Sequence, residues 1–349
     1  MDKVLTVVIP TYNMERYLRY CLDSLCVSRG GEALEVLVVN DGSKDTSSAI
    51  AHEYEQKHPG IFRVIDKENG NYGSCVNRGL AEAKGKYIKV LDADDSFDTE
   101  NFECFIDFLC NTDADLVLSD FAVVDEYREV KKTVSFRLGQ GSYFCMEDVC
   151  TSDVFSSMQM HAVTYRLSNL LDMGYKQTEG ISYTDQQWIF SPMVHVKTVA
   201  VFNDRPVYMY LVGRAGQTVD PKIKIKRMAE LAKNALGMAV QYDKYHRLVT
   251  EKVRTYLDAR IRPNVQDIYI TCFSNRSKVD TDILRRFDYE LHKKAPILYD
   301  YIGGVNPYIS FWRNTVMRYT WFEGLFSICF TFLLRLKLLF RQPNGVING

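Results

Sequence analysis

The chain has 349 residues, of which 46% are hydrophobic, and 43 Lys and Arg residues nearly balance 44 Asp and Glu residues. This length accommodates one large domain and an additional smaller region, and the formal net charge of −1 argues against nucleic acid as the main partner. The nine cysteines include no C-x-x-C pair and no zinc-type spacing, and the first residues do not form a signal-peptide pattern, so we expect a cytoplasmic protein.

Short apolar runs alternate with helical patterns through about the first 120 residues. Strands are expected at 5–10, 35–40, 62–65, 86–91 and 115–119. Helices are expected at 18–25 and 44–57, and a third is expected to end at Gly85, which serves as a C-terminal cap. Continuous Val, Ile and Leu runs that alternate with helices predict an α/β domain, with a parallel sheet covered on both faces.

Three carboxylates, Asp92, Asp94 and Asp95, directly follow the fourth expected strand. Like charges this close repel one another, and a hard divalent cation bound by their oxygens would remove that cost and hold the phosphates of a substrate. The alternative is a solvated turn, because Asp also suits turns and helix caps.

Other polar residues follow the first two strands. Thr11 and Asn13 come after the first strand, and Asp41 comes after the second. Since the carboxyl ends of parallel strands meet at one crevice, we expect these residues to converge with the acidic cluster.

Five segments, in this order and spacing, resemble the family 2 glycosyltransferases with the GT-A fold. They are 7–13, 39–45, 77–80, 83–88 and 91–95. The resemblance is strong over about the first 120 residues and extends more loosely to about residue 220. It implies a Rossmann-like, mostly parallel sheet that binds a nucleotide-diphosphate sugar.

The resemblance also implies roles for single residues. The donor-binding positions are Pro10, Thr11, Tyr12, Asn13, Asp41, Asn77, Arg78, Asp92, Ala93 and Arg214. Asp94 and Asp92 are the expected ligands of Mn²⁺ or Mg²⁺, and Asp95 is either a further ligand or a supporting residue. The cation would neutralise the charge that grows on the departing nucleoside diphosphate. A surface arginine is the alternative for Arg214.

One departure from the family pattern concerns the nucleotide base. Many relatives have an Arg-Asn pair where this chain has Val76-Asn77. Arg78 is one position further along the expected helix, which turns a side chain by about 100°. Arg78, Lys67 or Lys84 could supply the missing charge, so the preference for UDP over other nucleotides stays open.

Asp185, in the segment 182–188, resembles the catalytic base of the family. A carboxylate near the acceptor hydroxyl would take its proton, and a single base with direct displacement implies inversion at the anomeric carbon. Asp185 also suits a helix N-cap. By the same resemblance, His161 and Trp188 are candidates for the acceptor side, although a lone His is more often structural.

The region after about residue 220 has a helical character and ends in a dense aromatic and aliphatic segment at about 308–341. Residues 311–349 contain five basic residues and one acid, Glu323. The longest uncharged run, 324–334, has eleven residues, whereas a spanning helix needs about twenty. The pattern therefore favours a helix lying in a membrane interface. The alternative is a helix packed on the core or on a second subunit.

Taken together, we expect a GT-A domain at 1–220 and a helical, membrane-associating region at 221–349. The expected activity is inverting, metal-dependent transfer of one sugar from a UDP-sugar, or another nucleotide-diphosphate sugar, to a lipid-linked glycan. The expected setting is surface polysaccharide synthesis at the inner face of the plasma membrane, and the protein is a possible homo-oligomer. The alternatives are a nucleotide-sugar-binding protein and a nucleotidyltransferase of similar fold. A glycine-rich phosphate loop, typical of the latter, does not follow the first strand.

Overall fold

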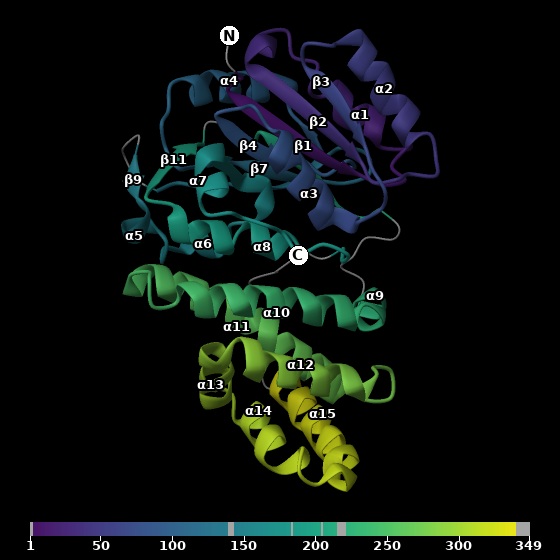
Figure 1. The fold of residues 1–349 in the computed structure, drawn as a ribbon, viewed down its shortest axis with the longest axis vertical. Coiled ribbons are helices and arrows are strands. Elements are labelled where there is room, and N and C mark those ends of the chain that lie inside the picture. The colour runs from purple at the N-terminus through teal and green to yellow at the C-terminus, as the bar shows by residue number, and fades with distance from the viewer. Residues whose placement is uncertain (1–2, 139–142, 183, 204, 215–220, 340–349) are drawn as a thin grey trace. The chain divides into compact units, whose positions relative to one another are not determined.

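The computed structural model describes residues 3–138, 143–182, 184–203, 205–214 and 221–339 (Figure 1). The chain divides into two compact units. The first comprises Met1–Gln217 and Leu248–Leu257, and the second comprises Thr218–Arg247 and Asp258–Gly349.

An eight-stranded sheet in the order β3-β2-β1-β4-β10-β6-β11-β9 forms the centre of the first unit. Its strands are β3 (Phe62–Asp66), β2 (Leu34–Asn40), β1 (Leu5–Thr11), β4 (Tyr87–Val90), β10 (Val163–Arg166), β6 (Leu116–Ser119), β11 (Thr198–Phe202) and β9 (Phe144–Cys145). Strand β1 pairs in parallel with β2 and β4, and β2 pairs in parallel with β3. The expected mostly parallel sheet is confirmed, but β10 runs antiparallel between β4 and β6, which the sequence pattern did not predict.

A second sheet has the order β5-β12-β7-β8. Its strands are β5 (Ser96–Phe97), β12 (Tyr208–Leu211), β7 (Phe121–Val124) and β8 (Val130–Val134). Because β5 directly follows the acidic turn after β4 and pairs with β12, this sheet brings residues near 210 beside that turn.

Helices flank the large sheet (Figure 1). The α-helices of this part are α1 (Leu18–Asp23), α2 (Ser47–Lys57), α3 (Asn71–Glu82), α4 (Thr99–Cys110), α5 (Met146–Val149), α6 (Asp153–Ser156), α7 (Leu167–Asp172) and α8 (Asp185–Trp188). Short 3-10 turns lie at Gly31–Ala33, Met160–Ala162 and Ser191–His195. Strands β1 and β2 are buried along their whole length, as expected for strands covered on both faces.

Two glycines set how closely α3 and β4 approach β1. A Cβ on Gly79 would lie 2.4 Å from Cγ1 of Val8, so only glycine allows α3 to pack this close. The prediction that Gly85 caps α3 was wrong, because the helix ends at Glu82. A Cβ on Gly85 would instead lie 2.5 Å from the backbone nitrogen of Thr6, so this glycine permits a close backbone approach.

The strand order explains where a ligand can bind. Strand β1 lies between β2 and β4. The chain passes from β1 to β2 and β3 on one side of β1, and then crosses to β4 on the other side. Such a switch point leaves a crevice outside the carboxyl ends of the strands. Thr11 ends β1, Asp41 follows β2, and the 92–95 turn follows β4, so all three border this crevice.

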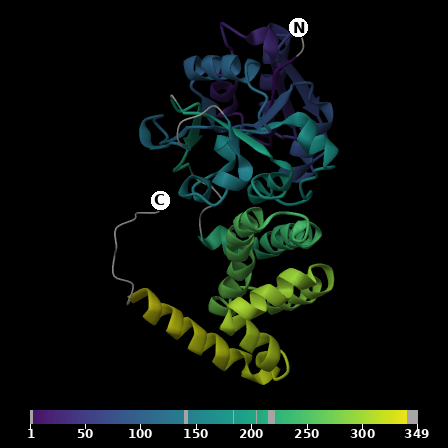
Figure 2. The ribbon, with the colours of Figure 1, turned by 90° about the vertical axis from the view of Figure 1, so that its left-hand side faces the viewer.

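The second unit is built of helices, with α15 as its last (Figure 2). Its α-helices are α9 (Pro221–Lys226), α10 (Met228–Tyr245), the larger part of α11 (Glu251–Ser274), α12 (Thr281–Lys294), α13 (Pro296–Val305), α14 (Pro307–Phe311) and α15 (Glu323–Leu339). A π-helical turn spans Trp312–Val316 and a 3-10 turn spans Thr320–Phe322. Arg313 pairs with the buried Asp288 at 2.7 Å and stacks 3.5 Å from the ring centroid of Tyr299, which fixes the π-helical turn on this core.

Candidate active site

Asp41 is held at the amino end of α3. Its carboxylate accepts hydrogen bonds from the backbone N–H groups of Gly70 and Asn71, both at 2.9 Å, and it also pairs with Lys67. The first N–H groups of a helix have no partner within the helix and carry partial positive charge, so a carboxylate is favoured there. Of the three cations that the sequence analysis offered for the base end, Lys67 is the one that contacts Asp41.

The loop after β1 presents one aromatic side chain. Thr11 is buried and donates its hydroxyl to the carbonyl of Ile9, whereas Tyr12 is 45% exposed. Asn13 adopts a left-handed backbone (φ 54°), and its side-chain oxygen accepts a hydrogen bond from the N–H of Lys44 at 2.7 Å. Asn13 therefore stabilises the loop after β2 through this hydrogen bond. The exposed ring of Tyr12 is accessible to a ligand. Pro10 is buried in β1.

The acidic turn is tied to β12 through Tyr208. Its hydroxyl donates to the carboxylate of Asp95 at 2.6 Å and accepts a hydrogen bond from the backbone N–H of Asp92 at 3.1 Å. The other oxygen of Asp95 accepts from the N–H of Leu211 at 2.7 Å. Asp94 pairs with Arg214, and Ala93 is buried in the turn.

Burial and mutual repulsion make Asp92 and Asp95 hard to ionise. Burial, with the nearby charges of Asp185 and Asp94, raises the pKa of Asp92 to about 8. Burial, with the charges of Asp94 and Asp92, raises the pKa of Asp95 well above its ordinary value. A positively charged ligand beside a carboxyl group with a raised pKa is favoured, because it stabilises the ionised form that burial and repulsion disfavour.

Three side chains converge on a possible cation position. Ligand atoms of Asp92, Asp95 and His161 lie within 4.8 Å of one another. Burial, with the charge of Lys89, lowers the pKa of His161 to about 3, so its imidazole is neutral and able to ligate. Two carboxylates and a neutral imidazole fit Mn²⁺ and also suit Mg²⁺ in their oxygen ligands. Asp94, predicted from the sequence as a metal ligand, is not part of this set.

A buried lysine donates a hydrogen bond to the backbone of His161. Lys89, on β4, is fully buried and donates to the carbonyl of His161 at 2.7 Å. Burial lowers the pKa of Lys89 to about 7. The ring of His161 stacks on Tyr210 of β12, with centroids 4.1 Å apart. The sequence analysis missed Lys89, because a single lysine in an apolar strand carries no periodic signal.

Asp185 is the first residue of α8 and is exposed. Although part of the residue reaches solvent, the partial burial of its carboxyl group raises its pKa to about 6. Its charge in turn raises the pKa of Asp92, Tyr72 and Tyr210, which places it in the same site as the acidic turn.

Tyr72, in the first turn of α3, is a site residue that the sequence analysis missed. Its hydroxyl donates to Asp92 at 2.7 Å, and the charge of Asp185 also acts on it. Tyr72 therefore interacts with both the expected donor-side carboxylate and the expected base. Only its place in the first turn after Gly70 could have drawn attention to it.

Three predicted site residues make other contacts. The side-chain amide of Asn77 donates to the carbonyl of Gln177 at 2.9 Å and to Glu179 at 2.8 Å, so it joins α3 to the loop before α8. Arg78 pairs with Glu82 one turn further along α3. Trp188 is 1% exposed, and its indole packs edge-on against Tyr165 and Tyr175. Its ring lies in the core, so it does not face an acceptor in this structure.

Comparison with known proteins bears on the family and the fold of the chain. Residues 6–165 match the family model described as glycosyl transferase family 2. The chain is 33% identical over 135 residues to the putative glycosyltransferase EpsH of Bacillus subtilis. This alignment covers 39% of this chain and 38% of EpsH. The chain spans only 18% of the length of another curated glycosyltransferase that it matches.

Solved structures share the fold over most of the chain. The structure of S. aureus TarS 1–349 in complex with UDP-GlcNAc has a TM-score of 0.59 at 19% identity, covering 94% of this chain and 89% of that one. The mannosyltransferase PcManGT from Pyrobaculum calidifontis, in complex with GDP-Man and Mn²⁺, has a TM-score of 0.50 at 14% identity, covering 86% and 85%. In residues 6–165 the chain thus carries a glycosyltransferase domain of glycosyl transferase family 2, and the fold is GT-A.

Proposed function

We propose that this chain moves a single sugar from a nucleotide-diphosphate donor to a hydroxyl group of a lipid-linked glycan, with inversion at the anomeric carbon. The observation that carries the proposal is the proximity of Asp185 to Asp92. An exposed carboxylate, able to act as a base, acts electrostatically on the half-buried Asp92 of the DxD-type turn and raises its pKa. A protein that only binds nucleotide sugars has no need of a base such as Asp185.

The donor is a UDP-sugar that binds along the crevice. The nucleoside lies against Thr11, Tyr12 and Asp41, and the sugar diphosphate reaches the turn at Asp92. The UDP-GlcNAc bound to TarS supports this choice of nucleotide, since that chain shares the GT-A fold. The GDP-Man bound to PcManGT keeps a guanine nucleotide as the second candidate.

Asp92, Asp95 and His161 would hold Mn²⁺ or Mg²⁺, with Asp94 reaching the site after it leaves Arg214. The cation supplies charge neutralisation for the nucleoside diphosphate that departs. The chain's own contribution is a rigid frame, because Tyr208 and Lys89 fix the groups around that position.

Asp185 acts on the acceptor. Its ionised carboxylate accepts the proton of the acceptor hydroxyl while that oxygen forms a bond to the anomeric carbon. The bond from this carbon to the diphosphate oxygen breaks on the opposite side, and the electron pair leaves with the nucleoside diphosphate. One displacement of this kind inverts the anomeric configuration.

The proposed place of action is the cytoplasmic face of the plasma membrane, where lipid-linked glycans for surface polysaccharides are assembled. All nine cysteines are free thiols, which suits a reducing compartment.

A donor panel tests the proposal. The chain is incubated with UDP-, GDP- and dTDP-sugars, with and without Mn²⁺, and its melting temperature and the release of nucleoside diphosphate are followed. A metal-dependent rise with one nucleotide, together with release of its diphosphate, is the expected result. Thermal stabilisation without turnover in the presence of lipid-linked acceptors would favour a binding protein. Formation of a nucleotide sugar from a sugar phosphate would favour a nucleotidyltransferase.

A further inference from the structure

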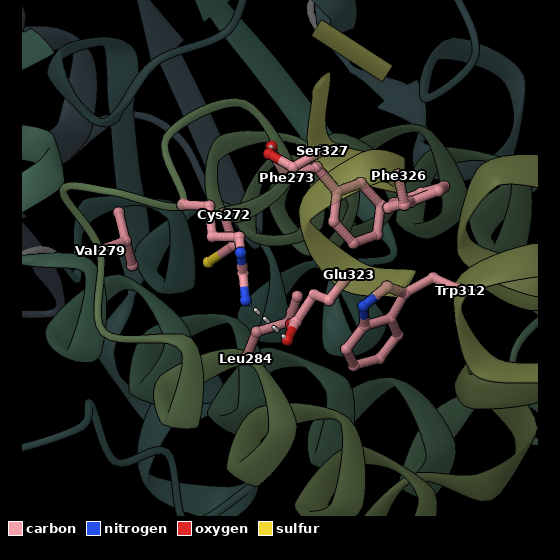
Figure 3. A pocket seen from close by; sticks show the side chains of 9 residues that line it. Cys272, Phe273, Val279, Leu284, Trp312, Glu323, Phe326 and Ser327 are labelled. Carbon is pink, nitrogen blue, oxygen red and sulfur yellow. Dashed lines mark hydrogen bonds and ion pairs between the residues drawn. The ribbon is translucent and has the colours of Figure 1, made fainter. Parts of the chain in front are cut away.

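Helix α15 is apolar on two opposite sides. On its inner side, Phe326 and Phe330 are buried, and both rings pack edge-on against Phe273, at centroid distances of 5.0 and 5.2 Å. Figure 3 shows this inner side, where Phe326 and Ser327 line a small pocket with Trp312. The inner apolar side is therefore part of the core of the second unit.

The single acid of this segment also faces inward. Glu323 lies in the same pocket, and its side chain is 12% exposed. It pairs with Arg285 at 3.0 Å and with Arg276 at 3.5 Å, so its charge is neutralised by the unit itself. The outward side of α15 carries no acid, since Glu323 is the one Asp or Glu among residues 301–339.

The outward side is a stripe of exposed apolar side chains. Trp321, Leu325, Ile328 and Phe332 are 81%, 51%, 69% and 61% exposed. Leu325, Ile328 and Phe332 are spaced by three and four residues, which places them on one side of α15 within an arc of about 60°. Trp321 lies in the 3-10 turn directly before this helix. We call these four residues the outer stripe. Arg335, three residues after Phe332, is exposed and lies on the same side by this spacing.

We infer that the outer stripe lies on an anionic lipid surface. Apolar side chains on two opposite sides of a helix each favour an apolar neighbour, and the core already covers the inner side of α15. The exposed Trp321 and the exposed Arg335 both suit a membrane interface, where indole rings and basic side chains meet lipid headgroups. Arg313 is taken up by its pair with Asp288, but Arg318 and Arg335 are exposed, while the one acid, Glu323, is paired inside the unit. The exposed charge that these residues add to the segment is therefore positive, which favours a negatively charged partner.

The geometry indicates a helix that lies along the surface. The 17 residues of α15 span about 25 Å, less than the roughly 30 Å of a bilayer core. None of the helices in the described ranges has the length and apolar character needed to cross a membrane. A helix lying in the interface buries one apolar side, as the outer stripe requires.

Tryptophan fluorescence tests this inference without any assay of sugar transfer. Trp188 and Trp312 are each 1% exposed, so a change in emission on adding vesicles reports mainly on Trp321. With the full chain, we expect a blue shift and co-flotation with vesicles of phosphatidylglycerol and phosphatidylcholine. Pure phosphatidylcholine should bind less protein, and added salt should weaken the binding to the anionic vesicles.

A double variant, Ile328→Ser with Phe332→Ser, is the decisive comparison. Both side chains are exposed, so the melting temperature should stay unchanged, whereas binding to anionic vesicles should fall about tenfold or more. Leu171→Ser, at a leucine on α7 that is 52% exposed, is the matched control and should bind like the unchanged chain.

Two results would overturn the inference. One is an emission spectrum and a flotation profile that anionic vesicles do not alter. The other is a Trp321 emission that is blue-shifted without lipid in a dimer seen by light scattering, which would assign the outer stripe to a second copy of this chain. Neither result bears on donor binding, so the proposed transferase function is tested separately by the donor panel.

Discussion

Arg214 forms an ion pair with Asp94, the carboxylate that the family resemblance assigns to the metal. The same guanidinium lies 5.6 Å from the ring centroid of Tyr17. The arginine expected to bind diphosphate is therefore paired with the carboxylate expected to bind the cation. Binding of donor and cation together would exchange both partners.

This pairing predicts opposite effects of Arg214→Ala on two ligands. Mn²⁺ should bind the donor-free variant several-fold more tightly, because Asp94 is released, whereas the donor should bind more weakly because a cation for its diphosphate is lost. Calorimetric titrations with Mn²⁺ alone and with UDP-sugar in the presence of Mn²⁺ measure the two effects.

Arg78→Ala is the control for this experiment, since Arg78 pairs with Glu82 on α3. It should leave the affinity for Mn²⁺ unchanged. If Arg214→Ala weakened Mn²⁺ binding in the donor-free protein, the exchange of partners would be wrong.

Asp185→Asn tests the proposed base. The amide keeps the shape of the side chain but cannot take a proton, so kcat should fall by about 10²- to 10⁴-fold while the donor affinity is retained. Asp172→Asn, at an exposed aspartate on α7, should keep the full rate. Steady-state kinetics and donor titrations would decide, and a variant of Asp185 with the unchanged rate would remove this residue from the mechanism.

The pH dependence of the reaction follows from the pKa of Asp185, which its surroundings raise to about 6. The base works when ionised, and the ionised fraction falls tenfold for each pH unit below the pKa. With Mn²⁺ saturating at every pH, we therefore expect kcat/KM to become level about one unit above this pKa and to fall with a slope approaching 1 below it. The slope should be absent in the residual activity of Asp185→Asn, and a limb that persisted there would belong to another group.

Gly79→Ala tests the close packing of α3 on β1. The new methyl group would meet the side chain of Val8 at 2.4 Å, so the helix must move outward. We expect a loss of about 1–3 kcal/mol in the free energy of unfolding. Gly60→Ala, where nothing lies within 4 Å, should change stability by less than about 0.5 kcal/mol. Urea denaturation of both variants makes the comparison, and equal losses would contradict the packing argument.

The amino-acid sequence by itself determined the framework of the first unit. The apolar runs that became β1, β2 and β4 are long enough to be buried on both faces, and such strands alternate with helices only in parallel arrangements. That alternation places Asp41 and the 92–95 turn at one edge of a sheet, because parallel strands end on the same side. These features depend on local patterns, and local patterns can be recognised in a single chain.

Only the tertiary structure decided which groups meet at that edge. His161 reaches Asp92 and Asp95 because β10 pairs antiparallel with β4, a contact between segments far apart in the sequence. Tyr72 and Lys89 join the site through packing, while Trp188 is drawn into the core by the aromatic rings around it. The two sides of α15 have similar composition, and one is exposed because only the other has a core to pack on. Side-chain partners of this kind depend on non-local packing, which residue spacing along the chain does not encode.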